Sequence, residues 1–337
     1  MKVLVTGCTS RQANPEASKK DVTFAYLLAT ALRGAGHEVE HRNPDITEDL
    51  SDFDHVFLGL APLHGLGSNR SYGAVAVALR TMSQGNLTLY IDDPDIGKVV
   101  SGLRTMVNEP KRFTKPFFAY KLQHDIASQP EYASWLSAGV KMLHENAWPS
   151  LLVPFHLWAT ASTAYERKVP QAAGRIWQLD LSNFMPKFDI QPAAERERRW
   201  IVEARDDNKW LSQQRPEMPM TRYGKGAQKR PHDMQLYKEY CNSWGVLQPP
   251  VDPVGWWDSR ITYAARAGAV YLSRWQDLSP LGTVYTDYLP DRVAAMSTEE
   301  RDDLAARQAE ALAAQMPSDE SNFDVLNDVM SKQGASV

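Results

Sequence analysis

Two short stretches of the chain hold the side chains with the clearest chemical potential, and the first is an acidic turn. The apolar run over residues 87–91 is followed directly by Asp92 and Asp93. A carboxylate partly shielded at the end of a buried strand can have a raised pKa and act as a general base toward a hydroxyl group. Because Asp-Asp and Asp-Pro runs also start helices, a helix-capping turn is the alternative. His64, on a Gly-rich segment, is a second candidate base, and its alternative is a solvated loop histidine.

The second stretch is the segment 244–274, in which a predicted strand leads through Gly255 and Trp257 into a predicted helix. The first turn of this helix carries Ser259 and Arg260. The free N–H groups of a helix N-terminus, together with an arginine, suit a diphosphate group. The alternative is an ordinary strand-helix-strand unit in which Arg260 is a solvated surface residue.

Polar loops form a third group of candidates, whose alternative in each case is a solvated surface loop. The segment 222–230 places four basic residues around two glycines, and such a loop can close over a diphosphate or follow a DNA backbone. Other polar residues, after the first strand and at a later helix start, can contact an anionic or base-like acceptor. These are Ser10, Arg11, Gln12, Asn14, Asn69 and Arg70.

The first half of the chain alternates strands with helices, and this alternation must position those candidates. Apolar runs predict strands over residues 3–6, 37–42, 55–60 and 87–91, and apolar residues at helical spacing predict helices over 21–32 and 72–81. The alternation predicts a parallel sheet with right-handed crossovers, whose ligands bind beyond the carboxyl ends of the strands. The candidate loops are therefore residues 7–20, 61–70 and 92–98.

A second array of strands and helices follows a polar run over residues 192–199, which is typical of a linker. It begins with a predicted strand over residues 200–204 and ends with another over 269–274. Residues 297–315 then predict an amphipathic helix that opens with a capping box of Ser297 and Glu300. The polar composition of residues 318–337 predicts a mobile tail.

Composition narrows the class of protein. The 337 residues suffice for two α/β domains, and 43% hydrophobic with 23% charged residues is typical of a soluble globular chain. No apolar run approaches the roughly 18 residues of a membrane span, and the first residues lack a signal peptide's apolar core, so we expect a cytoplasmic protein. Two cysteines exclude a disulfide scaffold. The net charge of -4 argues against tight, sequence-independent nucleic-acid binding unless basic residues cluster on one face.

The segment SRITYAARAGAVYLS, residues 259–273, resembles the C-terminal-domain signature of GT-B glycosyltransferases. The motifs MKVLVTG, AGHEVE, DFDHVFLGL and LTLYIDD have an order and spacing similar to those of bacteriophage DNA β-glucosyltransferases and the glycosyltransferase-like proteins of actinobacterial phages. The resemblance covers roughly two thirds of the chain. It implies an α/β, GT-B-like fold of two facing Rossmann-like domains: an acceptor-side domain over residues 1–190 and a nucleotide-sugar-binding domain over 191–290. A C-terminal helix and polar tail over 291–337 follow.

The resemblance also implies roles for individual residues. Arg260 would contact the diphosphate of a nucleotide-sugar donor such as UDP-glucose, Asp93 or Asp92 would be the base, and no metal ion is expected. Tyr263 departs from the pattern because the family has a ribose-binding glutamate there. A tyrosine can give one hydrogen bond or stack, but the bidentate clasp of a carboxylate is lost. The donor-site candidates are Arg260, Ser259, Tyr263, Trp257, Gly255, Arg222 and Lys225.

The run DDPD at residues 92–95 also matches the DxD motif of GT-A glycosyltransferases, which binds a divalent ion. That interpretation leaves the second array of strands and helices without a role, so the two-domain interpretation is preferred.

Together these inferences predict an enzyme that moves a sugar from a nucleotide-sugar donor to a hydroxyl acceptor. Where the resemblance extends to the substrate, the acceptor is a hydroxylated pyrimidine base in phage DNA. One alternative is a glycosyltransferase with a small-molecule or protein acceptor. The other is a degenerate nucleotide- or DNA-binding module without turnover, which the change at Tyr263 favours. The expected partners are a nucleotide sugar and DNA, with no membrane.

Overall fold

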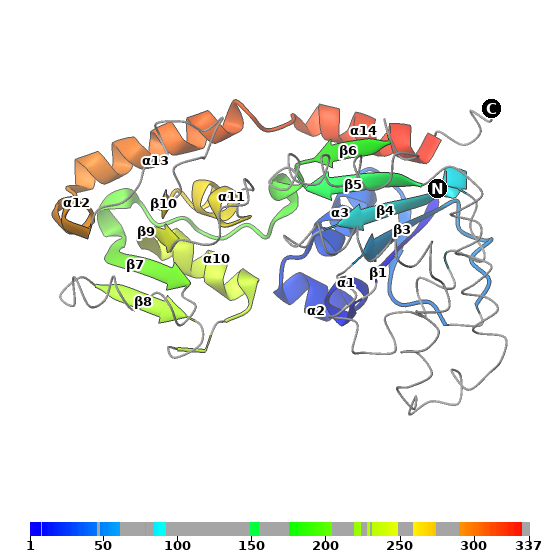
Figure 1. The fold of residues 1–337 in the computed structure, drawn as a ribbon, viewed down its shortest axis with the longest axis horizontal. Helices are drawn as coiled ribbons and strands as arrows, with labels where there is room; N and C mark the ends of the chain where they lie inside the picture. The colour runs from blue at the N-terminus through cyan, green and yellow to red at the C-terminus, as the bar shows by residue number, and fades with distance from the viewer. Residues whose placement is uncertain are drawn as a thin grey trace, which may run out of the picture. The chain divides into compact units, whose positions relative to one another are not determined.

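The computed structural model describes residues 1–7, 9–45, 48–60, 78, 84–91, 149–154, 175–203, 219–223, 228–229, 231–248, 259–273 and 290–331. The chain divides into two compact units: Met1–Phe184 with Pro317–Val337, and Met185–Met316. Each unit contains one sheet whose neighbouring strands are all parallel (Figure 1). The prediction of an α/β fold with two parallel-sheet domains is therefore confirmed. The chain passes into the second unit after Phe184, close to the expected boundary at residue 190.

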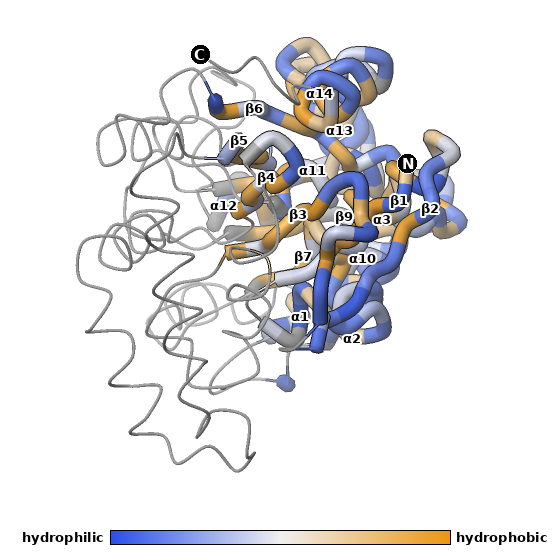
Figure 2. The backbone as a smooth tube through the Cα atoms, turned by 90° about the vertical axis from the view of Figure 1, so that its right-hand side faces the viewer, coloured by the Kyte–Doolittle hydropathy of each residue, from blue (hydrophilic) through white to orange (hydrophobic). Residues whose placement is uncertain are grey.

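The sheet of the first unit has six strands in the order β2-β1-β3-β4-β5-β6. Its strands are β1 (Lys2–Gly7), β2 (Glu38–His41), β3 (His55–Leu60), β4 (Leu87–Ile91), β5 (Ser150–Pro154) and β6 (Ile176–Leu179). The inner strands are buried and hydrophobic along most of their length (Figure 2), as a parallel sheet covered on both faces requires. The strands predicted in the first half of the chain are confirmed.

Three helices lie between β1 and β2: α1 (Ser10–Ala13), α2 (Pro15–Lys20) and α3 (Phe24–Gly34). The predicted helix over residues 21–32 therefore begins later, at Phe24, where the Thr23 side chain accepts a hydrogen bond from the Tyr26 N–H as the N-cap. The preceding segment, predicted as a loop, holds two short helices instead. The helix predicted over residues 72–81 lies outside the described residues except at Ala78, which is helical.

The sheet of the second unit has four strands in the order β10-β9-β7-β8. Its strands are β7 (Glu197–Glu203), β8 (Met220–Tyr223), β9 (Ser243–Gln248) and β10 (Val270–Ser273); its helices are α10 (Asp233–Asn242), α11 (Ser259–Arg266), α12 (Pro290–Ala295) and α13 (Thr298–Ala313). Written from the other edge, this order is β8-β7-β9-β10, so the second strand along the chain comes first, followed by the first, third and fourth strands. Strands β2, β1, β3 and β4 of the first sheet have the same order. In each sheet the strand order therefore reverses beside the first strand, between β1 and β3 and between β7 and β9.

The polar run over residues 192–199 is not a linker, so that prediction is wrong. Strand β7 already begins at Glu197, and the side chain of Arg196 is 7% exposed. Its guanidinium group donates to the nearby Gln191 carbonyl and to backbone carbonyls of two distant segments, as described below. The charged composition of this run suggested an exposed segment. A guanidinium can nevertheless be buried when all its hydrogen bonds are made, as at Arg196.

The C-terminal helices complete the edge of each sheet with one buried carboxamide. Gln308 of α13 accepts from the Tyr271 N–H at 2.8 Å and donates to the Tyr271 carbonyl at 2.7 Å, on edge strand β10. Asn322 of α14 (Asp319–Ser331) accepts from the Asp180 N–H at 2.9 Å and donates to the Asp180 carbonyl at 2.6 Å, directly after edge strand β6. A carboxamide has the donor and acceptor of a peptide group, so each side chain stands in for a missing neighbouring strand.

The tail predicted over residues 318–337 forms α14 over most of its length, so this prediction is wrong for Asp319–Ser331. Leu326, Val329 and Met330 are buried, and the Phe323 ring meets the Phe184 ring edge-on at 5.9 Å between centroids. These apolar residues are spaced as on one helix face among polar neighbours, which made the segment look polar overall.

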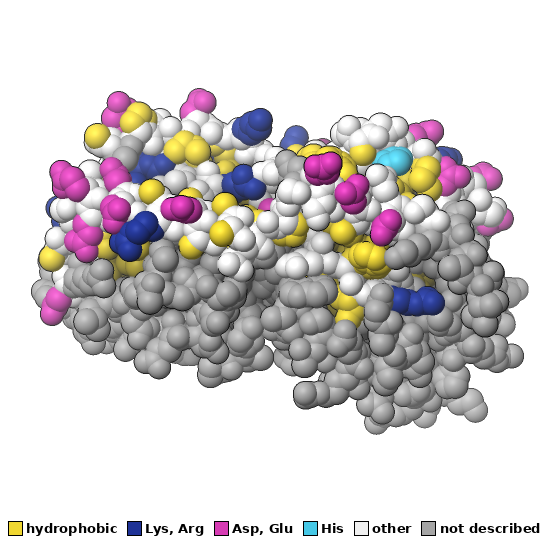
Figure 3. All heavy atoms as spheres, turned by 90° about the horizontal axis from the view of Figure 1, so that it is seen from above, with side chains coloured by type: hydrophobic (Ala, Val, Ile, Leu, Met, Phe, Trp, Pro, Cys, Tyr) yellow, Lys and Arg dark blue, Asp and Glu magenta, His cyan; other side chains and the backbone are white. Residues whose placement is uncertain are grey.

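Residues 297–331 also concentrate negative charge, with nine carboxylates and two arginines. Figure 3 shows acidic side chains on the surface of each unit. The rest of the chain therefore has more basic than acidic side chains, although the whole has a net charge of -4.

His55 is a buried neutral histidine at the start of β3. Its Nε2 lies 2.8 Å from the Thr88 hydroxyl, its ring packs 4.7 Å from the Phe57 ring, and 1% of it is exposed. Burial lowers the pKa of His55 to about 3. Unfolding therefore lets this imidazole take up a proton at mildly acidic pH.

We predict that Asn322→Ala lowers the free energy of unfolding by about 1–3 kcal/mol, because the Asp180 backbone groups lose their partners. Denaturant unfolding measures the change, and amide hydrogen exchange should rise in α14 and β6. Asn327→Ala, at an exposed position of the same helix, is the matched control and should stay within about 0.5 kcal/mol of wild type. Equal effects of the two substitutions would contradict the pairing.

We also predict that His55→Gln flattens the pH dependence of stability. The folded pKa lies below the unfolded value of 6.5, so the wild type is fully stabilised above that value and loses stability as the pH falls toward 3. In the wild type, His55 lowers the free energy of unfolding by up to about 1.4 kcal/mol for each pH unit below 6.5, and the variant should not show this decrease. Denaturant midpoints between pH 7 and about pH 5 check this. His232→Gln, in the second unit, should leave the pH profile of the first unit unchanged.

Candidate functional site

Gln12 lies at the point in the first sheet where the strand order reverses, and it braces the turn there. Its side chain is 2% exposed; Nε2 donates to the Leu60 carbonyl at the end of β3 at 3.1 Å, and Oε1 accepts from the Thr9 N–H at 3.2 Å. A Cβ at Gly7 would lie 2.5 Å from Gln12 Cβ, so only a glycine lets Gln12 fold over the end of β1. The prediction that Gln12 contacts an acceptor is therefore wrong.

His41, the last residue of β2, supports the same turn. Its Nε2 donates to the Gln12 carbonyl at 2.6 Å. Burial lowers the pKa of His41, while the bond to Gln12 acts in the opposite direction. A neutral imidazole and a buried carboxamide therefore hold the β1–α1 turn at the carboxyl edge of the first sheet. Sequence reasoning missed His41, and it gave Gln12, five residues after the end of β1, a different role.

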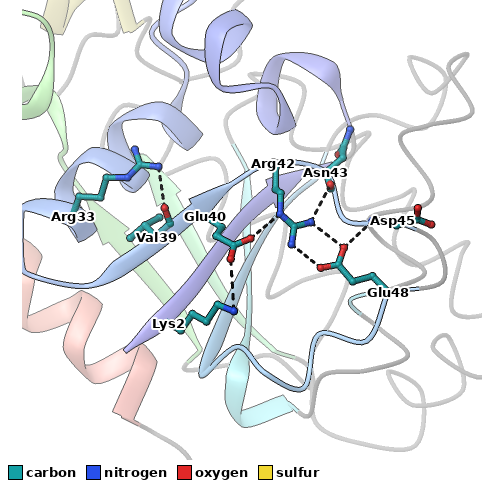
Figure 4. A network of polar contacts seen from close by, with 8 residues as sticks. All are labelled: Lys2, Arg33, Val39, Glu40, Arg42, Asn43, Asp45 and Glu48. Carbon is teal, nitrogen blue, oxygen red and sulfur yellow. Dashed lines mark hydrogen bonds and ion pairs between the residues drawn. The ribbon is translucent and has the colours of Figure 1, made fainter.

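Charged residues fix the segment that follows β2 (Figure 4). The Arg42 guanidinium binds both carboxylate oxygens of Glu48, at 2.9 and 2.6 Å, and its Nε donates to Glu40 at 2.7 Å. Glu48 raises the pKa of Arg42, and Arg42 lowers the pKa of Glu48. These charges satisfy one another, so the network stabilises the end of an edge strand and does not supply a reactive group.

Besides Gln12, three of the predicted acceptor residues lie in the described turn after β1: Ser10, Arg11 and Asn14. Ser10 begins α1, and the Arg11 Nε pairs with an Asp21 carboxylate oxygen at 2.7 Å. The Asn14 Oδ1 accepts from the N–H groups of Glu16 and Ala17 at 3.0 and 3.1 Å and so caps α2. Arg11 and Asn14 thus stabilise the turn itself. Asn69 and Arg70 lie outside the described residues.

The candidate bases Asp92, Asp93 and His64 also lie outside the described residues. The described part supplies their context: β4 pairs with β3 on one side and β5 on the other, and it ends at Ile91. Asp92 is therefore the first residue beyond the carboxyl end of an inner strand.

In the second unit, the carboxyl edge of the sheet collects three of the predicted donor residues. Because α11 connects parallel strands β9 and β10, its first residues Ser259 and Arg260 stand at the carboxyl edge. Arg222 is near the carboxyl end of β8, at the other side of β7. Gly255, Trp257 and Lys225 lie outside the described residues.

Tyr263 packs in an aromatic row between α10 and α11. Its ring lies 6.2 Å from the Tyr237 ring, which in turn lies 5.5 Å from the Phe188 ring. Burial raises the pKa of Tyr237 to about 12. Tyr263 thus packs against a ring of α10, and a phenol supplies no bidentate acceptor.

Two buried arginines stand at the other end of α11. Arg196 donates to the carbonyls of Gln191, Ser243 and Ala267, and Arg301 of α13 donates to those of Trp244 and Gly268. Sequence reasoning missed both. The signal for Arg301 was its place on the buried stripe of α13 with Leu304, Ala305, Gln308 and Leu312.

No three or more His, Cys, Asp or Glu side chains within the described ranges gather in a way that could hold a metal ion. The DDPD run falls outside those ranges. Among the helices of the described part, none is long and apolar enough to cross a membrane.

No protein-family model and no curated protein matches the sequence. Among solved structures, the chain is similar to the glycosyltransferase SnogD from Streptomyces nogalater, at 12% identity and a TM-score of 0.42, over 96% of this chain and 98% of that one. It is also similar to an α-glucosyltransferase in complex with UDP and a 13-mer DNA containing an HMU base, at 10% identity and a TM-score of 0.47, over 98% and 99% of the two chains.

We predict that Gln12→Glu destabilises the first unit by about 1–3 kcal/mol, because a carboxylate cannot donate to the buried Leu60 carbonyl. Denaturant unfolding and hydrogen exchange over residues 9–13 report the change. Glu16→Gln, the reverse exchange at an exposed position of α2, is the control and should change stability by less than about 0.5 kcal/mol. A fully stable Gln12→Glu protein would show that the brace is dispensable.

Proposed function

We propose that the protein is a glycosyltransferase that binds a nucleotide sugar, UDP-glucose or a related donor, with its second unit and transfers the sugar to a hydroxyl group bound by its first. The observation that carries this proposal is the placement of Ser259 and Arg260 on the first turn of α11, at the carboxyl edge of a parallel sheet and directly beyond the segment that leaves β9. Ligands of such sheets bind at that edge.

Arg260 and the N–H groups of the first turn of α11 would hold the diphosphate. When the bond between the anomeric carbon and the diphosphate oxygen breaks, negative charge grows on the leaving diphosphate. A guanidinium and a helix N-terminus stabilise that charge. Because Tyr263 lies against Tyr237, the ribose would be held by other contacts. The further donor contacts that we propose are Ser259, Trp257, Gly255, Arg222 and Lys225.

Asp93, or its neighbour Asp92, would take the proton from the acceptor hydroxyl as its oxygen attacks the anomeric carbon. The support is the position of this pair just past the carboxyl end of β4, an inner strand of the first sheet. His64 is the second candidate for this role. The proposal uses no metal ion, since the arginine and the helix N-terminus supply the positive charge that a cation would bring.

The acceptor that we propose is a hydroxylated pyrimidine base in DNA, which must leave the base stack to reach the base catalyst. The order of the motifs along the chain supports this choice. Charge distribution also permits it, because the acidic residues gather on the C-terminal helices and leave an excess of basic residues elsewhere. Ser10, Arg11, Asn14, Asn69 and Arg70 are the proposed acceptor contacts. A small molecule or a protein is the alternative acceptor.

We predict that Arg260→Ala weakens UDP binding about tenfold or more, because it removes a charge-assisted contact to the diphosphate. Arg266→Ala, at the opposite end of the same helix, is the matched control and should bind UDP like the wild type. Titration calorimetry measures both. Equal affinities of the two variants would remove the diphosphate role from Arg260.

Transfer assays with UDP-glucose, and with DNA that contains or lacks 5-hydroxymethylated pyrimidines, extend the same experiment. Asp93→Asn should keep UDP affinity and lose turnover by about 100-fold or more. Full activity in that variant would overturn the assignment of the base. Donor binding by the wild type with neither transfer nor donor hydrolysis would favour a nucleotide-binding module without turnover.

A further inference from the structure

The C-terminal end of α11 is closed by a glycine and gripped by two arginines. Gly268 has a φ of +61°, and its N–H and that of Ala269 return to the carbonyls of Ala265 and Ala264, as in a Schellman cap. Guanidinium groups bind the carbonyls of the next two residues after the helix: Arg196 donates to Ala267 at 2.6 Å, and Arg301 donates to Gly268 at 2.5 Å. Cations here also face the negative end of the helix dipole.

Each guanidinium ties this helix end to other parts of the second unit. Arg196 also donates to the Ser243 carbonyl at the start of β9, at 3.3 Å. Arg301 also donates to the next carbonyl, that of Trp244, at 3.0 Å, and pairs with Asp302 at 2.7 Å. The end of α11 is thereby joined to β9 and α13 by directional bonds.

Stability alone does not explain this pair. Arg196 and Arg301 are 7% and 2% exposed, so two guanidinium groups are buried close to each other. They repel each other: burial and, secondly, the Arg301 charge lower the pKa of Arg196 to about 10. Apolar residues of similar size often stabilise a protein at least as well as buried charges, so what the arginines add is a defined geometry.

The geometry matters because α11 is short. Its eight residues span about 12 Å, so a tilt of about 5° at the C-terminal end moves the N-terminal end by about 1 Å. A displacement of about 1 Å in a positioning element can cost about 100-fold in activity.

We propose that Arg196 and Arg301 are positioning residues for the donor: they hold the C-terminal end of α11 so that Ser259 and Arg260, at its other end, meet the diphosphate. This inference rests on the proposed function. It assigns to two residues at the amino edge of the sheet an effect on a ligand bound at the carboxyl edge.

Arg198 provides a matched control in the same unit. Its Nη2 donates to the carbonyls of Ala294 and Met296, both at 3.2 Å, at the end of α12, and its guanidinium lies 4.8 Å over the Trp244 ring. It therefore has the same chemistry at a different helix end. Arg198→Lys should cost stability without displacing α11.

The test compares Arg196→Lys, Arg301→Lys and Arg198→Lys in the full chain. A lysine keeps the charge but lacks the separate nitrogens of a rigid, planar guanidinium, each of which here bonds a different carbonyl, so the first two variants should raise the Kd for UDP and the KM for the donor about tenfold. The KM for the acceptor should not change. Hydrogen exchange over residues 259–266 should rise in the same two variants. Arg198→Lys should remain within about twofold of wild type for UDP.

The outcomes separate this inference from the proposed function. A wild-type protein that does not bind UDP would contradict the donor proposal itself. Wild-type binding, with Arg301→Lys no weaker for UDP than Arg198→Lys, would overturn the positioning role alone. If Arg301→Lys fails to fold, Asp302→Asn replaces it, because that change loosens Arg301 and leaves the two carbonyl bonds possible. It should weaken UDP binding about two- to threefold, and an unchanged affinity would equally overturn the inference.

Discussion

Backbone groups left over by the parallel sheets are the constraint on which the rest of the structure depends. A parallel strand at an edge, and a helix at its end, each expose donors or acceptors that must be paired once they are buried. Here side chains from distant parts of the chain pair them. Gln308 and Asn322 each satisfy both backbone groups of one residue, in edge strand β10 and directly after edge strand β6, and Arg196 and Arg301 bind the carbonyls of the two residues after α11. Directional hydrogen bonds therefore hold α13 and α14 to their sheets, in addition to apolar contacts.

The sheets of the two units have the same strand order over four strands. They differ in what lies at the carboxyl edge where this order reverses. In the first unit the turn after β1 is occupied by the buried Gln12, held between Leu60 and Thr9 and supported by His41. In the second unit the segment leaving β9 leads to α11, whose first turn stands at the carboxyl edge. The carboxyl edge is therefore occupied by a braced turn in the first unit and by the start of a helix in the second.

Local patterns predicted the elements best where one physical signal dominated. The continuous apolar runs of β3 and β4 and the capping box at Ser297 were identified because burial on both faces and an N-cap leave direct marks in the residue types. The polar run before Trp200 and the segment 318–337 were misjudged because their buried polar groups depend on partners far along the chain. Asn322 bonds to Asp180, and Arg196 bonds to Ala267. Composition within a short window does not reveal such partners.

The sequence by itself determined the alternation of strands and helices and the parallel sheets. It also determined that Asp92 follows a strand and that Arg260 begins a helix. These features depend on neighbours a few residues apart. Only the tertiary structure decided the strand order and the unit to which α14 belongs. It also decided the burial of four polar side chains, those of Arg196, Arg301, Gln308 and Asn322. A guanidinium or a carboxamide is stable in water and stable in the interior when fully hydrogen-bonded. Its residue type therefore fits both places, and only the distant backbone groups that it meets choose between them.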